Sequence, residues 1–597
     1  MKFLPRLRFG LRLLLLLVAL HIDNTSSVLA QQSVDQATVP GEVIEPGIEL
    51  HIEGERVVPG SVVEIPVIRT PQSVPVEMPI LEQPPARPKL RNLILLIGDG
   101  MGPQQLGLLS QFAHHSKQSP YPDDPDGGRQ TAIERLMNEG VVGLVRTEPY
   151  GSLVVDSAAA ATQLATGQPA GSEMIGTNAD GDSAETVLEV AKQSGRATGL
   201  VSDTRITHAT PAAFAAHQRH RSMENEIASD LLANQVDVML SGGLRNWIPE
   251  AAKDKESVTY AAVLQMTGGR FPVSSKRKDN RNLLLEARED YQLVFDRQGL
   301  DRLTEGRVLG LFADSGMDDA LMERAAEAEG KRTQPTLAEM TTKAVELLDQ
   351  RPEGFFLMVE GGQIDWAGHN NDAGTMLHEL LRFDAAVAAV LDWAKDRDDT
   401  LVIVTADHET GSFGFSYSGK PLPASRRLQG NIFNGNEYAP NFNFAGHKAL
   451  QRLYGQKQSF FAIFQTFDAL PGDEKTPEKL VELVNAAMPI KIDLDDAIRI
   501  LARERNQLYS EGHPYLGGQT VPKIDDFTAF YVYGENSRHN LLGRVLAEEQ
   551  NVVWGTGTHT STPVPLGAWG PEGVAKQFGG MKHATEIGQG MIELMRE

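Results

Sequence analysis

The chain of 597 residues contains no cysteine. It cannot form disulfides or carry a lipid-modified cysteine, and a chain of this length needs no disulfides because it can bury a large core. Any metal ion must therefore be held by His, Asp and Glu. Positive charge is also scarce, since 56 Lys and Arg face 79 Asp and Glu, for a formal net charge of −23. This balance argues against nucleic acid or an anionic membrane surface as a partner.

Long apolar runs are scarce too, and the run near the N-terminus is short. Leu13–Leu20 follows a basic segment at 2–12 and precedes Val-Leu-Ala at 28–30, which ends in a small residue as a cleavage site does. The pattern predicts a secretory signal peptide over residues 1–30. The alternative is an uncleaved N-terminal anchor, although the run is shorter than a membrane-spanning helix requires. We expect an exported protein, periplasmic or extracellular, with no membrane span after cleavage.

Residues 31–90 differ in composition from the rest of the chain. They hold 10 of the 33 prolines, interleaved with Val, Ile and Glu in short alternating stretches. Proline removes a backbone donor, so this segment is unsuited to the centre of a sheet. We predict an extended arm or linker that precedes the main domain at 91–597.

From residue 91 onward, apolar runs alternate with helical patterns. The run NLILLIGDGMG at 92–102 is continuous and ends in a Gly-rich turn, which is typical of a buried parallel strand. Helical periodicity occurs between such runs, for example at 183–195 and 336–350. The alternation predicts an α/β fold with a mostly parallel central sheet flanked by helices, and a ligand site at the carboxyl ends of the strands. Further predicted strands lie within 196–217, 236–243, 354–369 and 400–411.

The segment from 412 to about 550 interrupts this alternation. It includes an amphipathic stretch at 476–487, TPEKLVELVNAA. We interpret it as a large insertion near the predicted ligand site. Three roles for the insertion stay open: a lid, a crown over the site and an oligomer interface. The α/β pattern resumes at 551.

Polar residues of the types that bind metals or activate nucleophiles stand at the predicted strand ends. Asp365 and His369 are four residues apart, so on a helix they share one face. Asp407 and His408 are adjacent, so both can serve one site only where the strand gives way to a loop. The full set is Asp99, Asp156, Ser157, Thr210, Glu360, Asp365, His369, Asp407, His408 and His559.

Each of these residues also has an ordinary structural interpretation. Asp99 and Glu360 precede glycines as turn residues do, and Thr210 precedes a proline as an N-cap does. A lone histidine such as His559 is more often a surface or core residue than a ligand. Coincidence at so many successive strand ends is improbable, which favours a functional site.

The stretch VVDSAAAATQLATG at 154–167 illustrates the same choice. Asp156 and Ser157 before a run of alanines are an ordinary helix start. A serine at a helix N-terminus also lies in a positive field beside free N–H groups, which suits a phosphate.

Six motifs resemble the alkaline phosphatase family and stand in its order. They are NLILLIGDGMG, VVDSAAAATQLATG, THATPAAFAAH, VEGGQIDWAGH, VTADHETG and GTHTSTPVP, and the resemblance covers residue 91 to the end apart from much of 412–550. It implies a secreted phosphomonoesterase that acts through a phosphoserine, with two Zn²⁺ and one Mg²⁺. Small-molecule phosphate monoesters are the implied substrates, and both a monomer and a homodimer stay open.

The resemblance also implies a role for each residue. Ser157 corresponds to the nucleophile and Arg221 to the phosphate-clamping arginine, although Arg219 is close enough to compete for that role. The implied ligands are Asp99, Asp407 and His408 for the first zinc, Asp365, His369 and His559 for the second, and Asp99, Thr210 and Glu360 for magnesium.

Two neighbours of these residues leave finer points open. His208 and Trp366 stand where some family members have an acid and a lysine and others have His and Trp, so metal preference and pH optimum are undetermined. Three interpretations of His208 stay open: a group near the magnesium, a group that contacts phosphate through water, and a buried structural histidine. The rival functions are a phosphodiesterase or sulfatase-like enzyme with a similar two-metal core, and a non-catalytic phosphate-binding protein.

Overall fold

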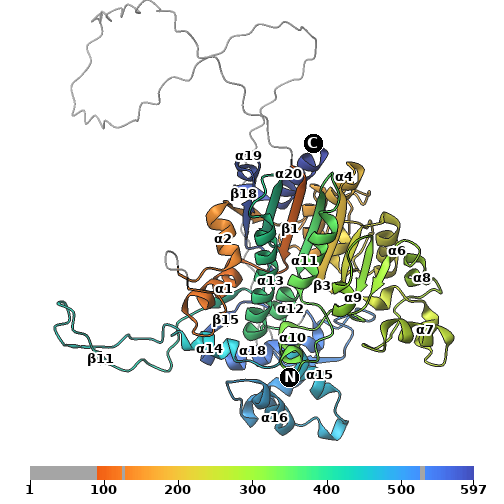
Figure 1. The fold of residues 1–597 in the computed structure, drawn as a ribbon. Helices are drawn as coiled ribbons and strands as arrows, with labels where there is room; N and C mark the ends of the chain where they lie inside the picture. Colours follow the sequence, from red (N-terminus) through yellow and green to blue (C-terminus); the bar gives the residue numbers. More distant parts are fainter. Residues whose placement is uncertain (1–89, 124–127, 525–531) are drawn as a thin grey trace, which may run out of the picture. The chain divides into compact units, whose positions relative to one another are not determined.

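The computed structural model describes residues 90–597 except 124–127 and 525–531 (Figure 1). These residues belong to one compact unit, Pro84–Glu597. The predicted signal peptide and the proline-rich segment lie outside the described residues, apart from Leu90. No described helix is long and apolar enough to cross a membrane.

A ten-stranded sheet forms the centre of the fold. Its middle strands, β1, β7 and β8, are buried at every position, as expected for continuous apolar runs covered on both faces. Within the sheet only β17 runs antiparallel to its neighbours, so the predicted mostly parallel sheet is confirmed. The strand order is β18 (Gly580–His583), β2 (Val141–Arg146), β17 (Val564–Trp569), β8 (Thr400–Thr405), β1 (Asn92–Gly98), β7 (Phe355–Gly361), β3 (Ala197–Arg205), β4 (Val238–Gly242), β6 (Val308–Leu311) and β5 (Gln292–Val294).

Two groups of helices flank this sheet. The first surrounds the long helix α13 (Ala373–Ala394), which contacts β1, β7 and β8 (Figure 1). The second surrounds the C-terminal helix α20 (Ala584–Arg596). The first group includes α1 (Pro103–His115), α2 (Ala132–Glu139), α10 (Ala320–Ala328), α11 (Leu337–Leu348) and α12 (Gln363–His369), and the second includes α3 (Ser157–Thr166), α4 (Val187–Gln193) and α5 (Ala209–Ala213).

The strands β4 to β6 are joined by a more irregular region. It packs its own apolar side chains, such as Trp247 and Leu283, into the main core. Its helices are α7 (Val258–Thr267), α8 (Leu283–Ala287) and α9 (Arg297–Asp301), and α6 (Glu224–Asn234) precedes it, between β3 and β4.

The segment predicted as an insertion carries a small hydrophobic core of its own. Phe460, Phe464 and Leu480 are fully or almost fully buried in this cluster, and the predicted amphipathic stretch forms α16. The chain enters the segment at β10 (Phe413–Phe415) and leaves it at β15 (Val552–Trp554). These two strands pair with each other outside the main sheet. Between them lie β11 (Arg426–Arg427), β12 (Glu437–Tyr438), α14 (Lys448–Tyr454), α15 (Phe460–Asp468), α16 (Pro477–Ala487), α17 (Leu494–Leu501), β13 (Arg503–Arg505), β14 (Thr520–Pro522) and α18 (Ser537–Gln550).

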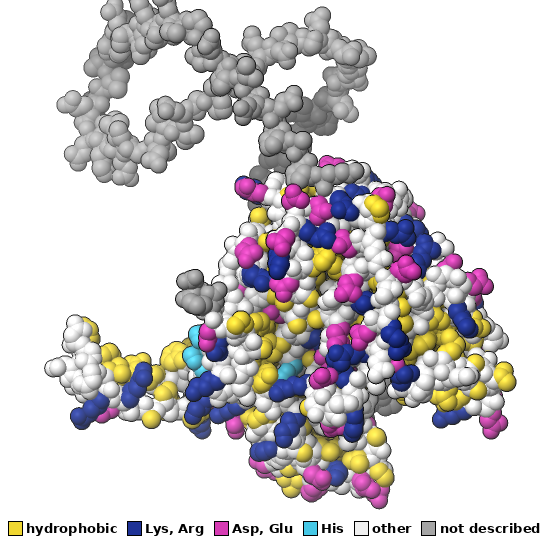
Figure 2. All heavy atoms as spheres, viewed as in Figure 1, with side chains coloured by type: hydrophobic (Ala, Val, Ile, Leu, Met, Phe, Trp, Pro, Cys, Tyr) yellow, Lys and Arg dark blue, Asp and Glu magenta, His cyan; other side chains and the backbone are white. Residues whose placement is uncertain are grey.

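The charges on the surface are mixed. Figure 2 shows Lys and Arg side chains interspersed with Asp and Glu over the visible face, rather than gathered in one patch. The acidic groups that matter most for chemistry are buried at the strand ends.

Candidate metal centre and nucleophile

Three neighbouring parallel strands deliver carboxylates to one edge of the sheet. Gly98 of β1 lies beside Gly361 of β7, and Ile97 lies beside Thr405 of β8. The residues that end these strands therefore converge. Asp99 follows β1, Glu360 is the penultimate residue of β7, and the loop after β8 carries Asp407 and His408.

Gly100 allows this edge to close tightly. Its φ is +75°, and a Cβ atom built there would lie 2.8 Å from the Cα of Asp365. A left-handed conformation and a close backbone approach both require glycine. The Gly-rich turn after β1 thus brings α12 against the strand end.

Ser157 is the first residue of α3, and its side chain is buried. Asp156 is the N-cap, because its Oδ2 accepts a hydrogen bond from the Ala158 N–H at 2.9 Å. The Ser157 Oγ lies 3.1 Å from Nε2 of His408. The alanines pack α3 against α5 and α20. The helix start is therefore both an ordinary N-cap and a contact with His408, in the loop that follows β8.

A first group of potential ligands comprises Asp99, Asp407 and His408, which lie with one ligand atom each within 4.8 Å of one another. Nε2 of His408 is 3.4 Å from Oδ1 of Asp99 and 3.2 Å from Oδ2 of Asp407. Within the described part of the chain, neither oxygen of Asp99 accepts a hydrogen bond, nor does Oδ2 of Asp407. Buried carboxylate oxygens without a partner are costly, and a divalent cation would satisfy them.

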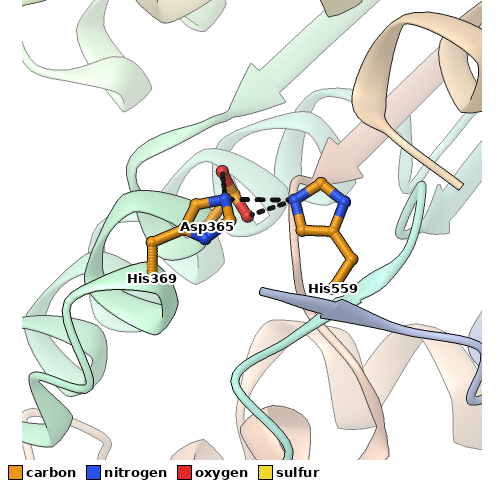
Figure 3. Close-up of side chains that lie close together, drawn as sticks. All are labelled: Asp365, His369 and His559. Carbon is orange, nitrogen blue, oxygen red and sulfur yellow. Dashed lines mark hydrogen bonds and ion pairs between the residues drawn. The ribbon is translucent and has the colours of Figure 1, made fainter. Parts of the chain in front are cut away.

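A second group comprises Asp365, His369 and His559 (Figure 3). Asp365 and His369 lie one turn apart on α12, as their spacing predicts, with 3.3 Å between Oδ2 and Nε2. His559 comes from the short strand β16 (His559–Thr560), which pairs with β9 (Glu409–Thr410). Its Nε2 is 3.1 Å from Nε2 of His369 and 3.4 Å from Oδ1 of Asp365. Three ligand atoms thus face one point.

Backbone carbonyls orient both imidazoles of this second group. Nδ1 of His369 lies 2.8 Å from the carbonyl oxygen of Gly557, and Nδ1 of His559 lies 2.8 Å from that of Val155. A carbonyl only accepts, so each Nδ1 carries the proton and each Nε2 presents a lone pair. This is the arrangement in which histidine binds a metal.

A third group combines Asp99, Glu360 and His208. Oε2 of Glu360 accepts hydrogen bonds from Ser202 and Thr204, whereas Oε1 has no hydrogen-bond partner among the described residues. Nδ1 of His208 is 3.7 Å from that free oxygen. His208 thus lies beside the unpartnered oxygen of Glu360.

Thr210 lies within α5, and the N-cap of that helix is His208. The N-cap interpretation of Thr210 is therefore wrong. Its Oγ1 is buried and has no hydrogen-bond partner in the described chain. A buried hydroxyl oxygen of this kind is a suitable ligand for a hard cation.

Burial and mutual repulsion shape the electrostatics of these groups. Burial raises the pKa of Asp99 well above its ordinary value, and the negative charges of Asp407 and Asp365 raise it further. Burial likewise lowers the pKa of His408 well below its ordinary value, with His559 acting in the same direction. The imidazole of His408 is thus held neutral, as a ligand must be.

Arg221 contacts Asp156, the residue that precedes Ser157. Nη1 of Arg221 donates to Oδ2 of Asp156 at 3.3 Å, and Nη2 lies 3.3 Å from Nε2 of His208. The side chain of Arg219 is exposed. The backbone N–H of Arg221 donates to the Glu173 carbonyl at 2.8 Å, which fixes this turn. The geometry therefore separates two arginines that the sequence could not.

The insertion contributes Tyr533, which the sequence analysis did not identify. Its ring lies edge-on to that of His369, with centroids 4.7 Å apart and planes at 71°. Asn540 of α18 donates to the backbone carbonyl of His369 at 2.7 Å. Burial raises the pKa of the Tyr533 phenol above its ordinary value, Asp365 adds to the effect, and Arg221 opposes it. The contact arises from tertiary packing, so no local pattern signals it.

A family model described as alkaline phosphatase matches residues 90–596. The chain belongs to the alkaline phosphatase family. The resemblance drawn from the six motifs is confirmed, and with it the expected fold. The match extends across the inserted segment as well as the strands and helices that carry the buried acids.

Individual relatives agree with this assignment. Alkaline phosphatase 3 of Bacillus subtilis is 29% identical over 524 residues, which cover 85% of this chain and 89% of that protein. The crystal structure of Thermus thermophilus alkaline phosphatase superposes with a TM-score of 0.65 at 25% identity, covering 84% of this chain and 90% of that one. A cold-active alkaline phosphatase from Shewanella sp. gives a TM-score of 0.58 at 26% identity, covering 85% and 100%.

Proposed function

We propose that this protein is a metal-dependent alkaline phosphatase that hydrolyses phosphate monoesters through a covalent phosphoserine at Ser157. The observation that carries the proposal is the position of the Ser157 Oγ, at the N-terminus of α3 and 3.1 Å from Nε2 of His408. A buried hydroxyl beside clustered carboxylates and imidazoles suits nucleophilic attack on phosphorus.

Arg221 and α3 would bind the phosphoryl group. The guanidinium presents paired N–H donors to two phosphate oxygens, and Asp156 holds it in place through Nη1. The free N–H groups and positive end of α3 favour the same anion. Both elements orient the phosphorus toward Ser157.

Two displacements would complete the reaction. The Ser157 hydroxyl gives up its proton to solvent as its oxygen forms a bond to phosphorus and the bond to the ester oxygen breaks. The leaving group departs on the opposite side as an alkoxide, which takes a proton from water to become the alcohol. Water then attacks the phosphoserine, the serine oxygen leaves, and inorganic phosphate is released.

The first and third ligand groups fit divalent cations, because carboxylate oxygens of Asp99, Asp407 and Glu360 lack partners in the described chain. The second group fits one because Nε2 of His369 and Nε2 of His559 both lie beside the Asp365 carboxylate. We assign one Zn²⁺ to Asp99, Asp407 and His408, a second to Asp365, His369 and His559, and Mg²⁺ to Asp99, Thr210 and Glu360, with His208 beside it. When bound, such ions lower the pKa of a hydroxyl or water and neutralise charge on the phosphate.

The experiment that tests the function compares two substrates. The purified protein, supplied with zinc and magnesium, receives nitrophenyl phosphate and the matching diester at alkaline pH. We expect a large preference for the monoester that is lost on chelation. A preference for the diester would overturn the proposal in favour of a phosphodiesterase, and full metal content without turnover would favour a non-catalytic phosphate-binding protein.

We also infer that the chain is exported to the periplasm or the medium, with residues 1–30 removed and 31–90 forming an arm or linker. The basic segment, the short apolar run and Ala30 support this inference. N-terminal sequencing of the protein recovered outside the cytoplasm tests it, and an intact Met1 would contradict it.

A further inference from the structure

Tyr533 belongs to the insertion but lies against the catalytic edge. It stands just before the short helix η5 (Gly534–Asn536), and its ring meets the ring of His369 edge-on with centroids 4.7 Å apart. His369 is one of the three residues assigned to the second zinc. The tyrosine is therefore separated from the reaction centre by a single imidazole.

A row of rings relates Tyr533 to the nucleophile. The Ser157 Oγ contacts Nε2 of His408, whose ring stacks on that of His559 at 3.6 Å. Nε2 of His559 is 3.1 Å from Nε2 of His369, and Tyr533 follows. Tyr533 is thus at the far end of the row from Ser157. An in-line displacement sends the leaving group away from the attacking oxygen, and so toward this end.

The hydroxyl of Tyr533 makes no hydrogen bond to any part of the chain that the structure describes. Besides the ring of His369, the Tyr533 ring meets that of Tyr515, which is perpendicular to it with centroids 5.3 Å apart. Tyr515 is 51% exposed. The insertion therefore presents a half-buried aromatic ring, backed by a second one that reaches solvent, beside His369.

We propose that Tyr533 is a specificity-determining residue that packs against the leaving group and favours monoesters with planar aromatic leaving groups. This inference rests on the proposed phosphomonoesterase function and deepens it. An aryl or heteroaryl group offers a flat face or edge to the tyrosine ring, whereas a small alkyl group does not. The preference then comes from contact with the part of the substrate that departs, not with the phosphoryl group.

The test compares phenyl phosphate with a fluoroalkyl phosphate whose leaving alcohol has similar acidity. Matching the acidity removes the chemical difference between the two esters, so the ratio of their kcat/KM values reports recognition. Tyr533→Leu keeps an apolar side chain against His369 and removes the aromatic ring, and Tyr533→Phe keeps the ring and removes only the hydroxyl. Tyr417→Leu, at an exposed tyrosine elsewhere in the insertion, is the matched control.

We expect Y533L to lower kcat/KM for phenyl phosphate by about 2- to 12-fold and to leave the fluoroalkyl ester unchanged. Y533F and Y417L should retain the wild-type ratio. Inhibition by inorganic phosphate, which has no leaving group, should be the same in all four proteins. That last readout separates a leaving-group contact from a general disturbance of His369.

Two results would overturn the inference while leaving the proposed function intact. One is an unchanged ratio in Y533L, and the other is an equal loss for both esters accompanied by weaker phosphate inhibition. Wild-type protein that hydrolyses neither ester when loaded with zinc and magnesium would overturn the proposed function itself, and this inference with it.

Discussion

The Oγ atom of Ser157 lies 3.1 Å from the Nε2 atom of His408, although 251 positions separate the two residues in the chain. The start of a helix and the end of a strand produce this contact. Ser157 begins the helix α3, and His408 lies in the loop that follows the buried strand β8. Each end leaves polar groups that its own element cannot satisfy. Their convergence puts a hydroxyl beside carboxylates that lack partners among the described residues.

The two neighbouring arginines, Arg221 and Arg219, should differ in their contribution to activity. Arg221→Ala should lower kcat/KM for a phosphate monoester by about 10- to 100-fold, because charge-assisted hydrogen bonds contribute about 1.5–3 kcal/mol. Arg219→Ala should remain close to wild type, since that side chain is exposed. Steady-state kinetics and phosphate inhibition of both variants check this, and the reverse pattern would transfer the phosphate-binding role to Arg219.

Gly100 provides a test of how tightly the site is built. Gly100→Ala should cost about 2–3 kcal/mol of stability and most of the activity, because the new Cβ would meet the Cα of Asp365 at 2.8 Å. Gly181→Ala is the control, since Gly181 also has a positive φ, +88°, but nothing within 4 Å. It should cost about 1 kcal/mol and leave kcat/KM intact. Thermal unfolding and kinetics of both variants decide; equal effects would refute the steric argument.

Removing the metal ions should show how much the buried carboxylates lower the stability of the fold. Asp99→Asn should lower the metal content, measured by elemental analysis, and abolish most activity. In the chelated proteins, however, Asp99→Asn should have a free energy of unfolding about 1–3 kcal/mol above that of wild type, because wild type keeps a buried carboxylate near Asp407 and Glu360. Thermal unfolding of both chelated proteins measures this as a higher midpoint for the variant. A chelated variant less stable than chelated wild type would count against a metal-ligand role.

The pH dependence of stability should include a contribution from His217. The hydrogen bond between its Nε2 and Oε1 of Glu189, 3.0 Å long, raises the pKa of His217 above 6.5, and burial opposes the shift. A raised pKa in the folded state means stability that is present below 6.5 and lost as pH rises through the folded value. His217→Gln should therefore cost about 1 kcal/mol more near pH 5.5 than near pH 9.

Thermal unfolding of metal-loaded protein at both pH values measures this difference. His220→Gln is the matched control, because the ion pair of His220 with Glu173 is exposed and exposed pairs contribute little. The same cost for His217→Gln at both pH values would contradict the assigned role of Glu189.

Much of the site was predictable because the strand ends are marked in the sequence. A continuous apolar run ending in a polar residue predicts a buried strand and its carboxyl end, and β1 with Asp99 and β7 with Glu360 follow this rule. The four-residue spacing of Asp365 and His369 likewise predicted a shared helix face, which α12 provides.

The remaining features depend on packing that no local pattern reports. The strand β17 contains Pro565 and Gly567, which obscure its strand pattern, and it joins the sheet antiparallel. Arg221, and not Arg219, contacts Asp156, and this depends on the backbone turn in which the Arg221 N–H donates to the Glu173 carbonyl. Tyr533 approaches His369 because the insertion folds on its own core, so its position follows from tertiary structure alone.

The most direct test of the central claim is to trap the phosphoenzyme. Protein incubated with a phosphate monoester is quenched in acid, digested and analysed by peptide mass spectrometry. We predict phosphate on Ser157 in wild type and in the control Ser152→Ala, and none in Ser157→Ala, whose kcat/KM should fall by about 10³-fold or more. Phosphate on a different residue, or most of the activity surviving in Ser157→Ala, would contradict the account.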